Sequence, residues 1–216
     1  MYTPDMPASV IHLVRHGEVN NPDGVLYGRL GGFGLTDRGH EMAAAVGKYF
    51  QTRQISAVVS SPLARATQTA DAVADATGCA VRTDDRFIEG ANHFEGSRVS
   101  PQTLLVDPAA WSSLWNPFRP SWGESYRSVA QRMIAAMVDA SEQVEAGEVV
   151  VVSHQLPIWI VHRQAVGLPL HHSPRNRRCS LCSVTSFQKL GSAFTEVAYV
   201  EPAAVLADAA VDLGAV

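Results

Sequence analysis

The sequence predicts an α/β protein built on a mostly parallel sheet, and two observations carry this prediction. Strand-like apolar runs alternate with segments whose apolar residues recur at helical spacing, which is the pattern of βα units. Residues 149–152 are four consecutive valines, as expected of a strand covered on both faces. With 216 residues, 46% of them hydrophobic, the chain can build one substantial core, so we expect residues 1–216 to form a single domain.

The first half of the chain predicts two strands, each followed by a helix. Residues 10–14 form the first strand, and a glycine-rich loop over 20–35 leads to a helix capped by Thr36. Residues 56–60 form the second strand, and Ser61–Pro62 suit the cap and first position of the next helix. The inward faces of these helices follow helical spacing: Met42, Val46, Tyr49 and Phe50, then Ala66, Ala70, Val73 and Thr77.

The middle of the chain is the least regular. A short edge strand is expected near 79–82, and residues 84–98 show no clean period. The stretch 100–124 holds four prolines and three tryptophans. We therefore expect an irregular insertion at about 90–124, lying over the end of the sheet that carries the active site.

The last third returns to regular elements. Ser125 is expected to cap a long helix that Gly147 ends, and the valine strand follows it. A further helix over about 156–166 precedes two late strands, near 181–188 and 194–200.

Composition excludes several classes of protein. A formal net charge of -4 argues against a general nucleic-acid binder, which normally has a strongly basic face. No apolar run is long enough to span a membrane, and the first residues lack the pattern of a signal peptide, so we expect a cytoplasmic protein. Cys179 and Cys182 form a C-x-x-C in a strand-like context without a second ligand pair, which favours ordinary buried thiols over a zinc or redox site.

Three predicted strand ends carry or adjoin a basic side chain. Arg15 and His16 follow the first strand, Arg65 lies just beyond the second, and His154 follows the valine strand. Carboxyl ends of parallel strands share one edge of a sheet, so we expect these side chains to converge. Two guanidiniums and two imidazoles there predict a site for a dianionic phosphoryl group, with His16 as a nucleophile able to carry it.

These segments give the chain a resemblance to a known family. Leu-Val-Arg-His-Gly-Glu at 13–18, the segment 60–70 and Val-Val-Ser-His at 151–154 resemble the histidine phosphatase superfamily, in its phosphoglycerate-mutase-like group. Residues 34–39 and 123–125 fit weaker signatures of the same family. The resemblance implies a three-layer α/β/α sandwich with a mostly parallel sheet.

The resemblance also implies roles for individual residues. His16 would be phosphorylated during turnover, while Arg15, Arg65 and His154 would bind the transferring phosphoryl group. Nearby guanidiniums should keep the ring of His16 neutral, as attack requires, and should stabilise charge on the phosphoryl oxygens. Glu89 stands where the family places its general acid and later general base.

Several positions depart from the family pattern. Glu95 is the second candidate for the general acid, because the spacing after Glu89 is shortened by about one residue. Val19 and Pro22 replace a threonine and a phosphate-contacting asparagine of many relatives, for which Asn20 or Asn21 would substitute.

Two further segments around the predicted pocket leave alternatives open. Gln155 replaces the usual glycine after the second histidine but still offers its backbone N–H to an anion. The basic stretch 171–178 predicts a solvated charge run or, less strongly, a guide for an anionic substrate. Five aromatic residues predict either an apolar lid or the contact of a homodimer: Phe94, Trp111, Trp115, Phe118 and Trp122.

The leading hypothesis is a phosphomonoester hydrolase that passes the phosphoryl group of a small-molecule phosphate ester to His16 and then to water. It needs no metal and no cofactor. The first alternative is a bisphosphoglycerate-dependent phosphoglycerate mutase, although residues 90–125 hold little of a mutase-type substrate segment. The second is a phospho-ligand binding module in which the changes at 19, 22 and 155 have weakened catalysis.

Overall fold

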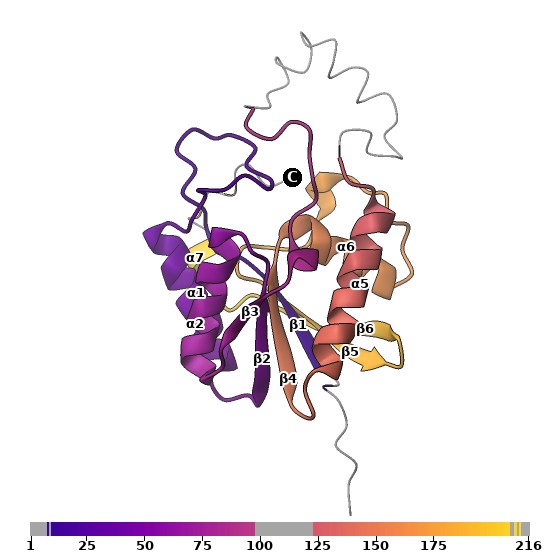
Figure 1. The fold of residues 1–216 in the computed structure, drawn as a ribbon. Helices are drawn as coiled ribbons and strands as arrows, with labels where there is room; N and C mark the ends of the chain where they lie inside the picture. The colour runs from indigo at the N-terminus through magenta and orange to yellow at the C-terminus, as the bar shows by residue number, and fades with distance from the viewer. Residues whose placement is uncertain (1–7, 9, 98–122, 208–209, 211, 213–216) are drawn as a thin grey trace, which may run out of the picture.

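A computed structural model describes residue 8 and residues 10–97, 123–207, 210 and 212 (Figure 1). In these residues six strands form one sheet in the order β3-β2-β4-β1-β5-β6. The first four are mutually parallel, β5 pairs antiparallel with β1, and β6 pairs antiparallel with β5. Their bounds are β1 Val10–Arg15, β2 Ile55–Ser60, β3 Val81–Thr83, β4 Glu148–Ser153, β5 Val184–Leu190 and β6 Ala193–Val200.

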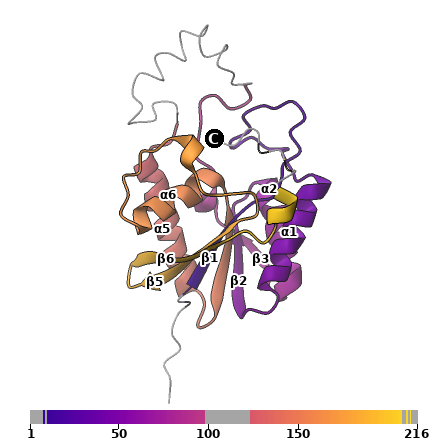
Figure 2. The same cartoon turned by 180° about the vertical axis from the view of Figure 1, so that it is seen from behind.

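Helices cover both faces of this sheet, as the two opposite views show (Figures 1 and 2). One face carries α1, α2 and the short α7, and the other carries α5 and α6. The predicted three-layer α/β/α sandwich is therefore confirmed. The bounds are α1 Asp37–Phe50, α2 Ala64–Thr77, α5 Tyr126–Glu142, α6 Gln155–Ala165 and α7 Ala204–Ala207, with short 3-10 turns η1 at Asp85–Phe87 and η2 at Pro174–Asn176.

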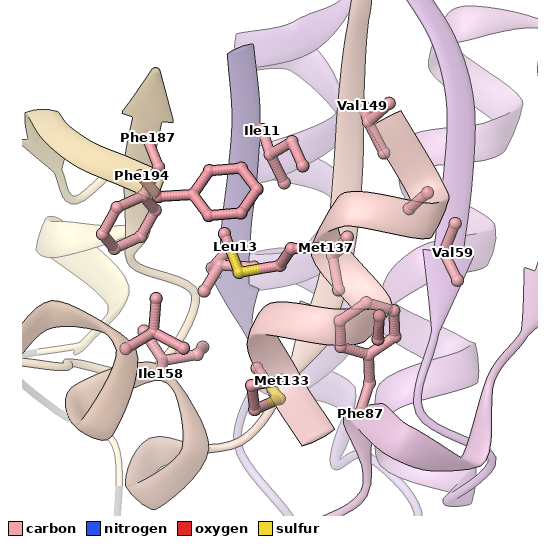
Figure 3. Packing of buried hydrophobic residues seen from close by; sticks show 14 of the residues in the cluster. Ile11, Leu13, Val59, Phe87, Met133, Met137, Val149, Ile158, Phe187 and Phe194 are labelled. Atoms are coloured by element: carbon pink, nitrogen blue, oxygen red, sulfur yellow. The ribbon is translucent and has the colours of Figure 1, made fainter. Parts of the chain in front are cut away.

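The core is divided into two layers by the sheet. Figure 3 shows Met133 and Met137 of α5 packed over Leu13 of β1, with Phe187 of β5 beside them. The other layer joins the apolar faces of α1 and α2 to the opposite sides of the same strands. All four residues of the valine run are fully buried, alternating between the two layers, which explains why this strand shows no polar face.

Helix ends agree with the sequence in part. Thr36 caps α1 by accepting the N–H of Gly39 at 2.9 Å, and Ser125 caps α5. The predicted cap at Ser61–Pro62 is wrong, because α2 starts at Ala64 after an N-cap at Leu63. Gly147 does not end α5 either, since that helix stops at Glu142.

The middle of the predicted insertion, residues 98–122, lies outside the described residues, and so do Trp111, Trp115, Phe118 and Trp122. Its two described ends meet through an antiparallel bridge between Asn92 and Gly123. In the part of the chain that the structure describes, none of the helices has the length and apolar character needed to cross a membrane.

Candidate active site

Three strands end side by side at the carboxyl edge of the sheet, below the loops seen above the strands in Figure 1. Register pairs Arg15 of β1 with Ser153 of β4, and Ser60 of β2 with Val152 of β4. The backbone N–H of His16 still donates to the carbonyl of Ser153, at 3.2 Å. The residues that follow these strands are thus neighbours in space although they are distant in sequence.

His16 is almost fully buried, with its ring in a defined tautomer. Nδ1 lies 2.8 Å from the carbonyl oxygen of Gly17, and because a carbonyl only accepts, Nδ1 carries the proton. Burial, followed by the positive charges of Arg65 and Arg15, holds the pKa of His16 well below its ordinary value. The neutral ring therefore keeps a lone pair on Nε2, as a nucleophile requires.

The backbone at His16 is locked by two helices. The N–H of Gly17 donates to Oγ1 of Thr69 in α2 at 3.1 Å, and a Cβ at Gly17 would lie 2.6 Å from the carbonyl oxygen of Gly39 in α1. Only glycine fits here. This explains the glycine after the histidine without reference to the reaction.

Arg15 is fully buried and carries a paired charge. Its Nη1 donates to the carbonyl of Cys179 at 2.7 Å, and its two Nη atoms contact the carboxylate of Asp212 at 2.8 and 2.5 Å. Burial alone would lower the pKa of Arg15, but the Asp212 carboxylate raises it overall. The Nε atom has no hydrogen-bond partner.

Arg65, in the first turn of α2, is equally buried. Its Nη2 donates to the carbonyl of Gly28 at 2.6 Å, and its guanidinium lies over the ring of Tyr27 at 4.6 Å. Nε and Nη1 have no hydrogen-bond partner.

The ring of His154 lies beside that of His16, with the ring centroids 5.2 Å apart. Nε2 of His154 forms a 2.7 Å hydrogen bond with Oγ of Ser61, whereas Nδ1 has no partner. Burial, and then the charge of Arg65, holds the pKa of His154 well below its ordinary value. Ser61 therefore positions this histidine instead of capping α2.

The unpartnered atoms define what the site can bind. In the described part of the chain, five buried side-chain polar atoms lack a hydrogen-bond partner, and four of them belong to Arg15, Arg65 and His154. Buried polar groups are normally hydrogen-bonded, so a cluster of this kind marks a candidate binding site. Guanidinium nitrogens are donors only, and the fitting ligand is an oxyanion.

Glu89 lies in the segment after η1 and is almost fully buried. Its Oε1 accepts the N–H of Gly90 at 2.8 Å. Burial raises the pKa of Glu89, against the opposing charges of Arg65, Arg177 and Arg15, so the carboxyl shares one electrostatic environment with the phosphate-binding candidates. Glu95, the other candidate, is only half-buried and accepts the N–H of Asn92 at 3.2 Å.

The remaining predicted contacts are placed differently. Both amide atoms of Asn21 bond to the backbone of Val25, which closes a turn of the loop, and Asn20 is exposed. Gln155 is the first residue of α6, and its Oε1 accepts Nη1 of Arg177 at 3.3 Å.

Sequence reasoning did not single out Arg177 or Tyr27, the residue whose ring lies under the guanidinium of Arg65. Arg177 is half-buried rather than solvated, and its Nε donates to His172 at 3.0 Å. Nothing in the basic stretch distinguishes it from Arg175 or Arg178, which are exposed. Its place depends on contacts with residues far along the chain.

Cys179 and Cys182 are free and buried, as predicted for structural thiols. Burial raises the pKa of Cys179 to about 11 and that of Cys182 to about 12, so both stay protonated at neutral pH. Among the described residues, no group of three or more His, Cys, Asp and Glu side chains could hold a metal ion.

Comparison with known proteins assigns the chain to a family and shows its relatives. The model of the histidine phosphatase superfamily (branch 1) matches residues 11–201. Rv0525, an uncharacterized protein of Mycobacterium tuberculosis, is 48% identical over 196 residues, which are 90% of this chain and 97% of that protein.

Two further relatives have names that state an activity. A probable phosphoglycerate mutase of Erwinia tasmaniensis, GpmB, is 30% identical over 184 residues, covering 81% of this chain and 82% of the mutase. The solved structure of the mycobacterial glucosyl-3-phosphoglycerate phosphatase Rv2419c is 25% identical, covers 89% of this chain and 96% of its own, and superposes with a TM-score of 0.69.

Proposed function

The chain belongs to the histidine phosphatase superfamily, branch 1, and from that membership we propose that it is a phosphomonoester hydrolase acting through His16. One observation carries the proposal: unpartnered guanidinium donors of Arg15 and Arg65 and the unpartnered Nδ1 of His154 are buried beside the strand end that carries the neutral imidazole of His16. A phosphoryl group would give these donors their missing acceptors. The proposed substrate is a small-molecule phosphate ester in the cytoplasm.

In the first step Nε2 of His16 attacks phosphorus, the N–P bond forms and the bond to the alcohol oxygen breaks. The proton on Nδ1 stays on that nitrogen and remains hydrogen-bonded to the carbonyl of Gly17. This bond fixes the orientation of the ring. The leaving oxygen takes a proton from Glu89, whose raised pKa favours the acid form needed at this moment. Arg15, Arg65 and His154 stabilise charge on the phosphoryl oxygens.

In the second step water attacks the phosphorus of phosphohistidine. Glu89, now a carboxylate, accepts a proton from that water, the N–P bond breaks, and His16 returns to its neutral form. The product is inorganic phosphate and the protons balance over the cycle, so the proposed steps use no metal or cofactor.

A mutase is the second candidate, favoured by the 30% identity to a probable phosphoglycerate mutase. Its chemistry uses the same phosphohistidine but returns the phosphoryl group to a hydroxyl of the bound intermediate. The glucosyl-3-phosphoglycerate phosphatase of similar fold hydrolyses instead, which supports water as the acceptor.

A screen of metabolite phosphomonoesters with released phosphate as the readout tests the proposal. We expect release from at least one ester, unaffected by EDTA, and an acid-labile phosphoenzyme that His16→Ala abolishes. Full activity of His16→Ala would overturn the mechanism. Conversion of 3- to 2-phosphoglycerate that depends on bisphosphoglycerate would establish the mutase, and tight phosphate binding without turnover would establish a binding module.

A further inference from the structure

The segment that carries Glu89 is held by an arginine from α5. Nη1 of Arg132 donates to the carbonyls of Arg86 at 2.6 Å and Ile88 at 2.7 Å, and Nη2 donates to the carbonyl of Glu89 at 3.3 Å. Arg86 lies in η1, whereas Ile88 and Glu89 follow it in a stretch that is neither helix nor strand. One side chain therefore sets the path of the residue proposed as the general acid.

A second arginine, from a different part of the chain, donates to the carbonyl of Glu89. Arg29, in the loop after β1, donates from Nε to the carbonyl of Glu89 at 2.7 Å. The backbone of Glu89 is thus gripped from a loop and from a helix that are far apart in sequence.

Glu124 joins the two arginines. Its Oε2 accepts Nη2 of Arg29 at 2.8 Å and Nη2 of Arg132 at 3.0 Å, while its Oε1 accepts Nε of Arg132 at 3.0 Å. Burial alone would raise the pKa of Glu124, but the hydrogen bonds and charge of Arg132 lower it overall, so this carboxylate stays ionised. The carboxylate of Glu124 thus partly neutralises the positive charges of Arg29 and Arg132, and the carboxyl of Glu89 takes no part in these bonds.

Glu124 is itself docked against the same segment. Its backbone N–H donates to the carbonyl of Ala91 at 3.0 Å, next to the bridge between Asn92 and Gly123. A Cβ at Gly123 would lie 2.2 Å from the carbonyl oxygen of Ala91, so the close approach requires glycine.

Arg132 has no donor left for a substrate. A guanidinium has five N–H groups, and its bonds to three carbonyls and to both oxygens of Glu124 use all five. Its guanidinium acts on the reaction only through the backbone and Glu124. A lysine would keep the charge but has three donors on one nitrogen, and it cannot reproduce a planar fork.

We infer that Arg132, bridged by Glu124 to Arg29, is a positioning residue that holds Glu89 at the leaving-group side of the pocket. The inference rests on the proposed function, since it concerns proton delivery by Glu89. A catalytic group displaced by about 1 Å loses on the order of 100-fold in rate. The loss should fall on the protonation of the leaving alcohol, the step that depends on Glu89.

Leaving-group dependence tests this directly. p-Nitrophenolate departs readily without a proton, whereas the alkoxide of glycerol phosphate needs one. We expect Arg132→Lys to lower kcat/KM about 100-fold for glycerol phosphate and at most a few-fold for p-nitrophenyl phosphate, the same bias as Glu89→Gln. In the Glu89→Gln background, Arg132→Lys should cost little more on either ester, because both changes remove one function.

Controls separate positioning from folding. Arg53→Lys alters an arginine that pairs with Glu148 at the start of β4, away from the segment of Glu89, and it should leave both esters unaffected. Glu124→Gln and Arg29→Lys should show the bias of Arg132→Lys at about tenfold, and they decide the question if Arg132→Lys fails to fold.

Two outcomes would overturn the inference: equal losses on both esters in the folded variants, or undiminished hydrolysis of glycerol phosphate. If the unaltered protein released phosphate from neither ester and from none of the screened metabolites, the proposed function itself would fail. That result is distinct from a failure of the positioning role.

Discussion

Two buried histidines near the first strand show how differently the same side chain is used. His12, within β1, and His16, just after it, are each 1% exposed. Burial is the largest cause that lowers the pKa of both rings. By exposure and pKa alone the two residues look alike.

Their hydrogen bonds separate them. His12 has a partner on each ring nitrogen, Ser186 at 2.8 Å and Glu148 at 3.0 Å. Around His16, by contrast, Arg15 and Arg65 carry unpartnered donors and Nδ1 of His154 has no partner. Burial identifies a core residue, whereas a group of unsatisfied donors identifies a site, and the predictions below test this distinction.

The largest effect on turnover should come from replacing His16 by alanine, and the same substitution at His12 is the comparison. His16→Ala should lower turnover by roughly 10⁴-fold or more, as loss of a nucleophile does. His12→Ala should leave kcat/KM within about threefold but destabilise the fold by about 1–3 kcal/mol, because Glu148 and Ser186 lose a partner. Steady-state kinetics measures kcat/KM of the two variants, and urea unfolding measures their free energy of unfolding. A strong loss of activity in folded His12→Ala would contradict the distinction.

Arginines offer the next comparison. Arg65→Ala should lower kcat/KM by about 10²–10³-fold, since in the proposed mechanism the guanidinium donates to charge that develops on the phosphoryl group. Arg53→Ala removes an exposed arginine that pairs with Glu148, and it should change activity little. Equal effects of the two substitutions on phosphate release would show that the unpartnered donors do not bind substrate.

Stability should fall on acidification. The folded-state pKa values of His12, His16 and His154 are lowered, so the unfolded chain binds protons that the folded chain does not. The contribution of these histidines to the free energy of unfolding is therefore fully present above the unfolded pKa of about 6.5. It is lost as the pH falls below that value, by up to about 1.4 kcal/mol per pH unit for each histidine. Urea unfolding at pH 7.5 and 5.5 measures this slope. His154→Gln should flatten it, and an unchanged slope would contradict the lowered pKa.

The smallest effect concerns Asp212, whose carboxylate pairs with Arg15. Asp212→Asn removes a negative charge beside the proposed phosphate site. We expect inorganic phosphate to inhibit about five- to tenfold more tightly, which corresponds to about 1–1.4 kcal/mol. Asp139→Asn, on the surface beside Arg86, is the control. Weaker inhibition in Asp212→Asn would mean that this carboxylate chiefly holds Arg15 in place.

Much of the fold could be predicted because it follows from local patterns. Apolar periodicity located the helices and strands, and Thr36 and Ser125 lie at the helix ends where capping chemistry places them. The convergence of the three strand ends required only that the strands be parallel neighbours at one edge.

What local patterns could not supply depends on contacts between distant residues. Ser61 suits a helix cap by type, yet its hydroxyl pairs with His154 across 93 positions. Arg15 and Asp212 are 197 positions apart, and no periodicity indicates their pairing. Arg132 is an ordinary helix residue in the sequence, and only the folded chain shows that three of its donors meet carbonyls at 86–89 and the other two meet Glu124.

The strand order affects how this protein can fold while it is being synthesised. β4 pairs with both β1 and β2, yet it is synthesised after all the other parallel strands. A nascent chain that ends before Glu148 therefore exposes apolar strand edges with no common neighbour, a state prone to aggregation. Until the valines emerge, no strand joins β1 to β2, although α1 packs on α2 and Gly17 bonds to Thr69. His154 follows β4 in the chain, so the candidate site should be completed late in translation.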